Sequence, residues 1–122
     1  MLRILYVEDN PDALRPIQRI ATLEGYELFT AETIADGLAL IGRQPPTLIL
    51  VDMLLPDGDG TELTRQVRAQ GFTGPIIMIS GYAMQGEREA CLAAGCSDFL
   101  VKPVEVGTFI DLFKRYDGDG VQ

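Results

Sequence analysis

The sequence predicts an α/β fold, a doubly wound sheet of five parallel strands with helices on both faces. Five short apolar runs alternate with helix-like stretches, and three runs are almost continuously apolar, as in parallel strands covered on both sides. Right-handed crossovers place the helices on both faces of such a sheet. The predicted strands are Ile4–Val7, Leu28–Thr30, Leu48–Val51, Ile76–Ile79 and Phe99–Val101.

The first helix follows the first strand directly. Asn10 is a suitable N-cap, and Pro11 fits the first turn, where a missing backbone donor does no harm. Pro16 falls inside the same helix, removes one backbone hydrogen bond and is expected to kink it. The apolar face of this helix carries Leu14, Ile17 and Ala21.

Four more helices are predicted, one after each later strand. Pro45 follows the second helix, and Gly95 follows the fourth, and both residue types commonly end helices. The four helices are expected at Thr33–Arg43, from near Thr61 to Gly71, at Gln85–Ala94 and at Val106–Tyr116. The 122 residues, 47% of them hydrophobic, fit one compact domain over residues 1–122.

The charge and the absence of one residue type exclude several functions. The net charge is −8, with 18 acids against 10 bases, so neither nucleic acid nor an anionic membrane is an expected partner. A cation or a basic protein surface fits better. The chain has no histidine, which excludes Ser-His-Asp catalysis, Cys-His catalysis and histidine metal sites.

The two cysteines favour a reducing compartment. Cys91 and Cys96 lie five positions apart, a spacing that matches neither a CxxC pair nor a zinc site. They are interpreted as small buried residues, and reduced thiols suit a cytoplasmic protein. The opening apolar segment ends at Glu8, which makes it too short for a signal peptide or a membrane span.

Polar residues follow four of the predicted strands at their C-terminal ends, the edge at which function collects in such sheets. Three carboxylates placed there repel one another and need a hard cation such as Mg²⁺, which prefers oxygen ligands. A lysine adds a point charge for a phosphate oxygen, a serine adds a hydrogen-bond donor, and an aspartate is a nucleophile suited to an aspartyl-phosphate. The set is Glu8, Asp9, Asp52, Ser80 and Lys102, and it indicates phosphoryl transfer to Asp52.

Simpler interpretations explain these residues less well. Asp52 follows four apolar residues, where a carboxylate without a partner would be costly. Ser80 alone would be an ordinary turn residue, and Phe99 alone would be a core residue. The stretch from Asp57 to Gly60 suggests calcium, but it lacks the EF-hand pattern at Thr61 and Glu62, so a turn into the third helix is expected.

Four sequence pieces resemble the receiver domains of two-component response regulators, including the single-domain chemotaxis type. They are the acidic pair in Val7–Asn10, the segment Leu50–Gly60, the Ser80-Gly81 step and the segment Phe99–Pro103. Each piece is weak alone, but all four occur in order at predicted strand ends.

The resemblance implies a flavodoxin-like fold with strand order 2-1-3-4-5. It also implies Mg²⁺ (or Mn²⁺) bound by Asp9, Asp52 and the backbone carbonyl of Leu54, with Glu8 acting through water. Asp52 would accept a phosphoryl group from the phosphohistidine of a sensor histidine kinase or of a histidine phosphotransfer protein. Ser80 and Phe99 would form the switch pair, and a cis peptide bond is expected before Pro103.

Some features depart from the family pattern. Phe99 lacks the hydroxyl of the tyrosine that often stands at its position, Gly81 replaces a commoner alanine, and Pro16 is unusual within the first helix. In the family, the positions of Leu54 and Tyr82 flank the path of the water that removes the phosphoryl group. Neither residue offers an acid or amide to orient that water, so slow hydrolysis is predicted.

Three other functions fit the sequence less well. A pseudo-receiver, used only for binding, predicts a damaged acid set, and this set is intact. A flavodoxin needs a loop rich in Ser, Thr and Gly after the first strand, and an aspartate phosphatase needs a second acid at Leu54. We therefore expect a signalling switch and not an enzyme. Its downstream protein, or a second copy, would bind the surface of the fourth helix, fifth strand and fifth helix. A free-standing regulator and a receiver from a larger chain both fit the sequence.

Overall fold

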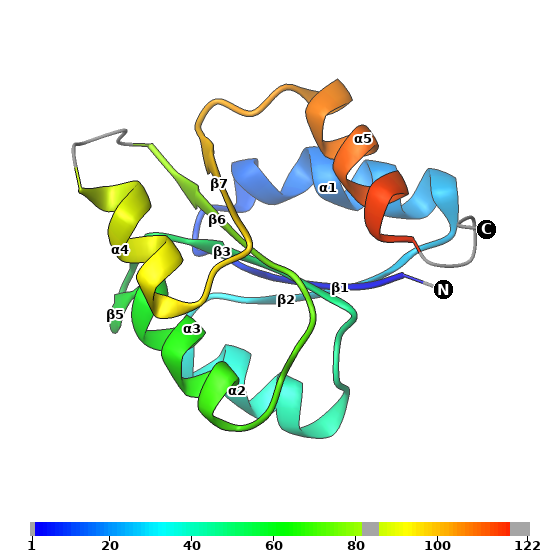
Figure 1. The fold of residues 1–122 in the computed structure, drawn as a ribbon. Helices are drawn as coiled ribbons and strands as arrows, with labels where there is room; N and C mark the ends of the chain where they lie inside the picture. Colours follow the sequence, from blue (N-terminus) through cyan, green and yellow to red (C-terminus); the bar gives the residue numbers. More distant parts are fainter. Residues whose placement is uncertain (1, 82–85, 118–122) are drawn as a thin grey trace.

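The computed structural model describes residues 2–81 and 86–117, and in this part of the chain five parallel strands form one sheet (Figure 1). The strands lie in the order β2-β1-β3-β6-β7, which is the predicted order 2-1-3-4-5 when only the strands of this sheet are counted. Their bounds are β1 Arg3–Val7, β2 Glu27–Ala31, β3 Leu48–Asp52, β6 Ile76–Ser80 and β7 Asp98–Val101. The predicted fold class is confirmed.

Helices cover both faces of the sheet, with α1 and α5 on one side and α2, α3 and α4 on the other (Figure 1). Each face has its own core, because side chains of successive strand residues point to opposite sides. Every residue of β3 and β6 is buried, as their apolar runs predict. The bounds are α1 Pro11–Glu24, α2 Ile34–Arg43, α3 Gly60–Ala69, α4 Glu87–Ala94 and α5 Val106–Tyr116.

The helix ends follow local sequence rules. The side chain of Asn10 accepts a hydrogen bond from the backbone of Asp12, and α1 ends at Gly25, whose φ of 77° favours glycine. The helix continues through Pro16 to Glu24. The predicted start of the fourth helix at Gln85 lies outside the described residues; α4 is described from Glu87.

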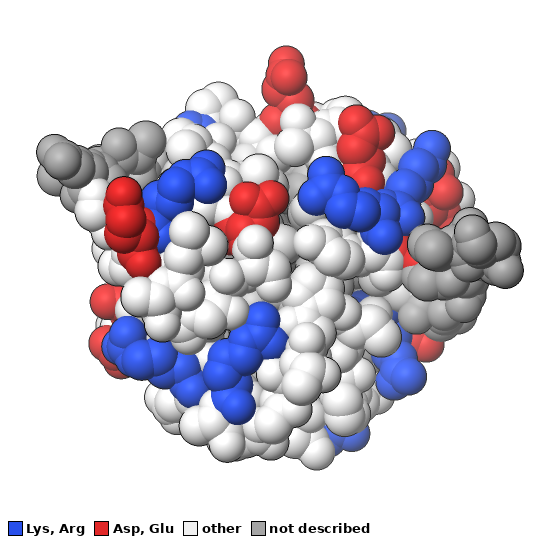
Figure 2. Space-filling model, viewed as in Figure 1, with Lys and Arg blue, Asp and Glu red and all other residues white. Residues whose placement is uncertain are grey.

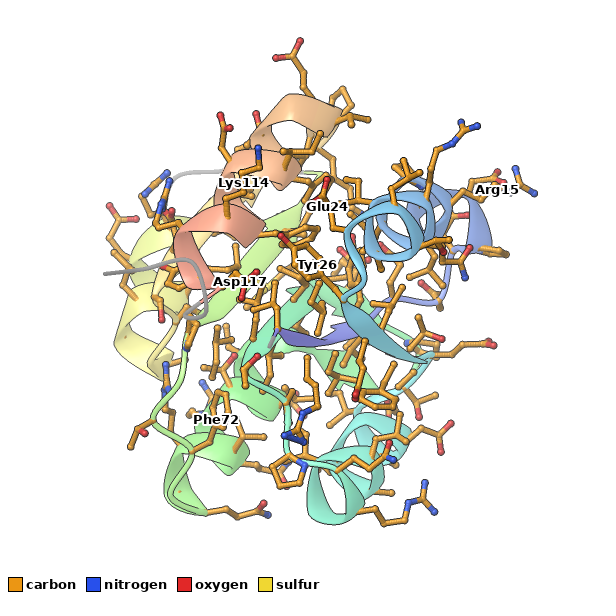
Figure 3. The ribbon with its side chains drawn as sticks, turned by 90° about the vertical axis from the view of Figure 1, so that its right-hand side faces the viewer. Arg15, Glu24, Tyr26, Phe72, Lys114 and Asp117 are labelled. Atoms are coloured by element: carbon orange, nitrogen blue, oxygen red, sulfur yellow. The ribbon has the colours of Figure 1, made fainter. Side chains whose placement is uncertain are left out.

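Aromatic rings pack together at the end of the sheet that lies opposite the polar strand ends. Tyr26 follows α1, and its ring meets that of Phe113 in α5 edge to face, with ring centres 6.0 Å apart. Glu24 and Asp117 lie beside Tyr26 (Figure 3), and burial together with these two carboxylates raises the pKa of the phenol. This contact packs the segment after α1 against α5.

One small element was not predicted. β4 (Leu54–Leu55) and β5 (Gly58–Asp59) pair antiparallel and form a hairpin between β3 and α3. Two residues per strand are too few to give an alternating pattern in the sequence.

The surface charge, the two cysteines and the helix lengths can be compared with what the composition suggests. On the face shown in Figure 2, acidic and basic side chains are interspersed, so the acidic excess is not gathered into one patch there. Cys91 and Cys96 are free thiols and are buried, as predicted. No helix in the described ranges is both apolar enough and long enough to cross a membrane.

Candidate phosphorylation site

Strand register brings the predicted site residues together. Val7 of β1 pairs with Val51 of β3, so the next residues, Glu8 and Asp52, lie side by side. On the other flank, Ser80 of β6 pairs with Val101, and the backbone of Lys102 donates to the carbonyl of Ser80 at 2.7 Å. Ordinary parallel pairing therefore collects residues from four strand ends at one edge.

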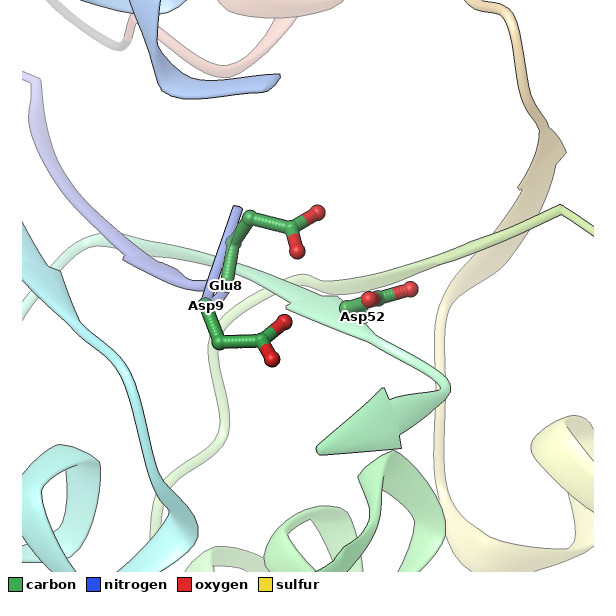
Figure 4. A group of neighbouring side chains, drawn as sticks. All are labelled: Glu8, Asp9 and Asp52. Carbon is green, nitrogen blue, oxygen red and sulfur yellow. The ribbon is translucent and has the colours of Figure 1, made fainter. Parts of the chain in front are cut away.

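Three carboxylates meet at this edge. Glu8, Asp9 and Asp52 each offer an oxygen atom, and these atoms lie within 4.8 Å of one another (Figure 4). Glu8 is 1% exposed and Asp52 is 8% exposed, while Asp9 faces solvent. Hard oxygen donors that are buried on one side and open on the other fit a divalent cation that keeps several water ligands. The role of the Leu54 carbonyl as a further ligand stays a prediction.

Lys102 lies between two of these acids. Its Nζ atom is 2.8 Å from Oε1 of Glu8 and 3.4 Å from Oδ1 of Asp52. The other carboxylate oxygen of Glu8 accepts a hydrogen bond of 3.2 Å from the backbone of Asn10. Glu8 is thus held at both oxygens. The predicted cis peptide bond between Lys102 and Pro103 is confirmed.

The pKa of Asp52 shows which electrostatic effect dominates. Burial and the nearby charge of Glu8 raise it from 3.8 to about 6, although Lys102 acts in the opposite direction. Burial opposes the charge on Lys102, but the hydrogen bond to Glu8 and the charge of Asp52 raise the pKa of the ammonium above its usual value. One lysine therefore does not neutralise the pocket, and the remaining negative charge favours a cation.

Tyr6 extends this network below the surface. Its ring is 1% exposed on β1, two residues before Glu8 and on the same side of the strand. Burial and the charges of Glu8 and Asp52 raise the pKa of its phenol, so the hydroxyl stays protonated beneath the acids. In the sequence, Tyr6 is one residue of an apolar strand, and no pattern marks it as a site residue.

Ser80 is held by a residue that the sequence analysis did not single out. Its Oγ atom donates a hydrogen bond of 2.6 Å to Oε1 of Glu87, the first residue of α4. Ser80 is 1% exposed, while Glu87 is half-buried. An acid seven residues after Ser80, at a helix start, is the only hint of this contact in the sequence.

The side chain of the other predicted switch residue, Phe99, is buried in the core. Phe99 is 4% exposed, and the guanidinium of Arg88 lies 5.5 Å from the centre of its ring. The same guanidinium donates to the backbone carbonyl of Phe99 at 3.4 Å. Little of the surface of this ring remains to be buried, and the role of Phe99 as a switch residue stays a prediction.

The segment after Asp52 is fixed at three points. The backbone of Gly60 donates to the carbonyl of Met53 at 2.8 Å and closes the β4–β5 hairpin. The carboxylate of Asp57 accepts hydrogen bonds from the first backbone amides of α2, at Ile34 and Ala35, over 2.9 and 3.1 Å.

The carboxylate of Asp59 caps α3 and also accepts a hydrogen bond from the hydroxyl of Thr61. Asp57 and Asp59 thus act as helix caps, in agreement with the predicted turn. Gly60 is needed where it stands, because a Cβ there would lie 2.6 Å from the carbonyl oxygen of Asp52. Leu54 in β4 is 58% exposed, and Tyr82 lies outside the described residues.

Comparisons with known proteins agree with this geometry. The family model of the response regulator receiver domain matches residues 4–114. The chain is 30% identical to the polar-differentiation response regulator DivK of Brucella ovis over 118 residues, which are 95% of this chain and 96% of DivK.

Two solved structures are also similar. A CheY-like receiver domain protein of Methanospirillum hungatei matches with a TM-score of 0.86 and 31% identity, over 98% of this chain and 99% of that chain. The receiver domain of the sensor histidine kinase PA1611 of Pseudomonas aeruginosa matches with a TM-score of 0.84 and 35% identity, over 96% and 98% of the two chains. That structure holds a magnesium ion in its active site cleft.

Proposed function

The chain belongs to the response regulator receiver domain family, and we propose that it is a switch that accepts a phosphoryl group on Asp52. The observation that carries the proposal is the position of Asp52, which lies within 4.8 Å of two other carboxylates and 3.4 Å from the ammonium of Lys102. A carboxylate in this setting is a suitable nucleophile, because Lys102 and a cation held by the three acids can neutralise the charge of the incoming phosphoryl group.

In the proposed reaction, a carboxylate oxygen of Asp52 attacks the phosphorus atom of a phosphohistidine on the partner. The new P–O bond forms as the P–N bond breaks, and the imidazole leaves with the electron pair of that bond. Asp9 and Asp52 would hold Mg²⁺ or Mn²⁺, with Glu8 acting through water and Leu54 through its carbonyl. When bound, the ion neutralises charge on the phosphoryl oxygens.

Lys102 changes partner during this reaction. Its ammonium now contacts Glu8 and Asp52, and a phosphoryl group on Asp52 offers it new anionic oxygens. Because Nζ of Lys102 already lies 3.4 Å from Oδ1 of Asp52, only a short movement separates the two arrangements. The chain's own contribution is thus positioning and charge compensation.

The proposed partners follow from this chemistry. The donor is a sensor histidine kinase or a histidine phosphotransfer protein, and the protein works as a signalling switch in the cytoplasm, where its two free thiols stay reduced. The receiving partner, or a second copy of the chain, binds the surface formed by α4, β7 and α5. Nucleic acid and membranes are not proposed as partners.

The test is phosphorylation by a small donor. The chain is incubated with Mg²⁺ and acetyl phosphate, and intact mass is measured for the parent, Asp52→Asn and Asp111→Asn, the last an exposed aspartate of α5. We expect one phosphoryl adduct in the parent and in Asp111→Asn, none in Asp52→Asn, and none in the parent with excess chelator. An adduct of parental yield in Asp52→Asn would refute the assignment.

A further inference from the structure

The connection between Ser80 and Glu87 joins two elements of the site. Ser80 is the last residue of β6, and Glu87 is the first residue of α4, so their hydrogen bond ties the end of the strand to the start of the helix. Gly86, the residue before α4, makes no side-chain capping hydrogen bond. The contact with Ser80 therefore anchors the first turn of this helix.

The chemistry of the two groups decides the direction of the bond. An ionised carboxylate only accepts hydrogen bonds, so the hydroxyl proton of Ser80 points to Glu87. A contact of 2.6 Å to a charged acceptor is a short, charge-assisted bond. Because a hydroxyl carries one proton, this proton is not available at the same time to a second acceptor on the other side of Ser80.

The second acceptor is the proposed phosphoryl group. Asp52 pairs with Ile79 in the sheet, and Ser80 is the next residue along β6 at the same edge. Oxygens of a phosphoryl group on Asp52 compete with Glu87 for the Ser80 proton, and their negative charge also repels the Glu87 carboxylate. Both effects oppose the Ser80–Glu87 bond.

We propose that Glu87 is a positioning residue that holds Ser80 in the resting arrangement and releases it when Asp52 is phosphorylated. This inference rests on the function proposed above. It adds that Glu87 competes with the phosphoryl group for the hydroxyl proton of Ser80. Release removes the anchor of the first turn of α4, next to Arg88, which covers Phe99. The state of Asp52 is thereby linked to the start of α4 through a single proton.

The test uses beryllofluoride, which stands in for the phosphoryl group, with Mg²⁺ and the full chain. Apparent dissociation constants are measured by calorimetry for the parent, Glu87→Gln, Ser80→Ala and the double variant. Glu89→Gln is the matched control, because Glu89 lies in the same first turn of α4 and is exposed. A neutral amide remains an acceptor but a weaker one, so Glu87→Gln should bind about 3- to 10-fold more tightly than the parent.

The double variant separates competition from a merely structural role. Glu87→Gln should change the affinity very little in the Ser80→Ala background, because alanine has no hydroxyl proton to donate. In the free Glu87→Gln protein, the amide signals of Gly86 and Arg88 should move toward their beryllofluoride-bound positions. Glu89→Gln should show neither effect.

Three results would overturn the proposal. They are affinity in Glu87→Gln equal to or weaker than that of Glu89→Gln, the same gain in the Ser80→Ala background, and unmoved amide signals. If the parent itself binds no beryllofluoride and forms no acetyl phosphate adduct, the proposed function fails, and Glu87 loses its role with it. A parent that is phosphorylated normally, with an unaffected Glu87→Gln, overturns the role of Glu87 alone.

Discussion

Lys102 and Glu8 form an ion pair of 2.8 Å across 94 positions of the sequence, at the edge where their strands end. The ammonium is thus engaged by a second carboxylate before any phosphoryl group reaches Asp52. A divalent cation that enters the pocket meets this positive charge and is repelled by it. The resting pocket is therefore partly compensated by one of its own side chains.

Replacing this lysine should separate cation binding from phosphorylation. In Lys102→Ala, the affinity for Mg²⁺ should be unchanged or up to about tenfold higher, because one positive charge leaves the pocket. The yield of acetyl phosphate adduct should nevertheless fall. Calorimetry with Mg²⁺ and intact mass measure the two effects, and Lys114→Ala, in an exposed part of α5, is the control. A sharp loss of Mg²⁺ affinity would show that Lys102 holds the pocket together.

The raised pKa of Asp52 predicts a pH-dependent stability in the absence of metal. Because the folded state binds this proton more tightly than the unfolded chain, the free energy of unfolding falls as pH rises from 3.8 to about 6. The shift corresponds to a loss on the order of 2–3 kcal/mol at neutral pH. Asp52→Asn does not ionise and escapes this loss, while Lys102 keeps Glu8 as its partner.

Denaturant unfolding in chelator, together with thermal unfolding with and without Mg²⁺, checks this expectation. Asp52→Asn should be more stable than the parent at pH 7.5, and the difference should shrink at pH 4.5. Mg²⁺ should raise the melting temperature of the parent at pH 7.5 and leave Asp52→Asn almost unchanged. A variant that is less stable than the parent at pH 7.5 would mean that Lys102 outweighs burial and Glu8.

The phosphoryl group on Asp52 is predicted to be lost slowly. Leu54 is 58% exposed beside the pocket and carries no group that orients a water molecule. Changing Leu54→Asn together with Tyr82→Glu should shorten the lifetime of the adduct, because an amide and an acid then orient the attacking water. Intact mass over time measures the loss, with Leu23→Asn, at an exposed leucine of α1, as control. Equal lifetimes in the parent and the double variant would contradict the prediction.

Phosphorylation is expected to reach a binding surface through Ser80 and Phe99. Since Phe99 is already buried under Arg88, the change should appear mainly in α4, β7 and α5, as a shift of their amide signals with beryllofluoride. The coupling free energy should be on the order of 1–3 kcal/mol, so that both states stay accessible. Ser80→Ala should lose most of the response. If this variant responded like the parent, the route would lie elsewhere, for example through α1.

The sequence predicted the elements of the fold because their signals are local. Continuous apolar runs at Leu48–Val51 and Ile76–Ile79 indicate strands covered on both faces, and Asn10 with Pro11 indicates a helix start. The acids at the strand ends were found in the same way, since parallel strands end at one edge.

The partners inside the site were harder to predict. The pairing of Lys102 with Glu8 depends on which of several nearby acids the side chain reaches, and no periodicity encodes that choice. Glu87 contacts Ser80 from seven positions further along the chain, and no local sequence pattern encodes that contact. Arg88 lies over the ring of Phe99, although its position in the sequence is typical of an ordinary helix surface.

The three fixed points of the segment after Asp52 have a thermodynamic consequence. Met53, Asp57 and Asp59 already hold this wall of the pocket through backbone closure and two helix caps, so its conformational entropy is lost when the chain folds. A ligand that binds against this wall does not have to order it. The entropy change of ligand binding should therefore arise on the opposite wall, where Ser80 and Lys102 are proposed to exchange their partners.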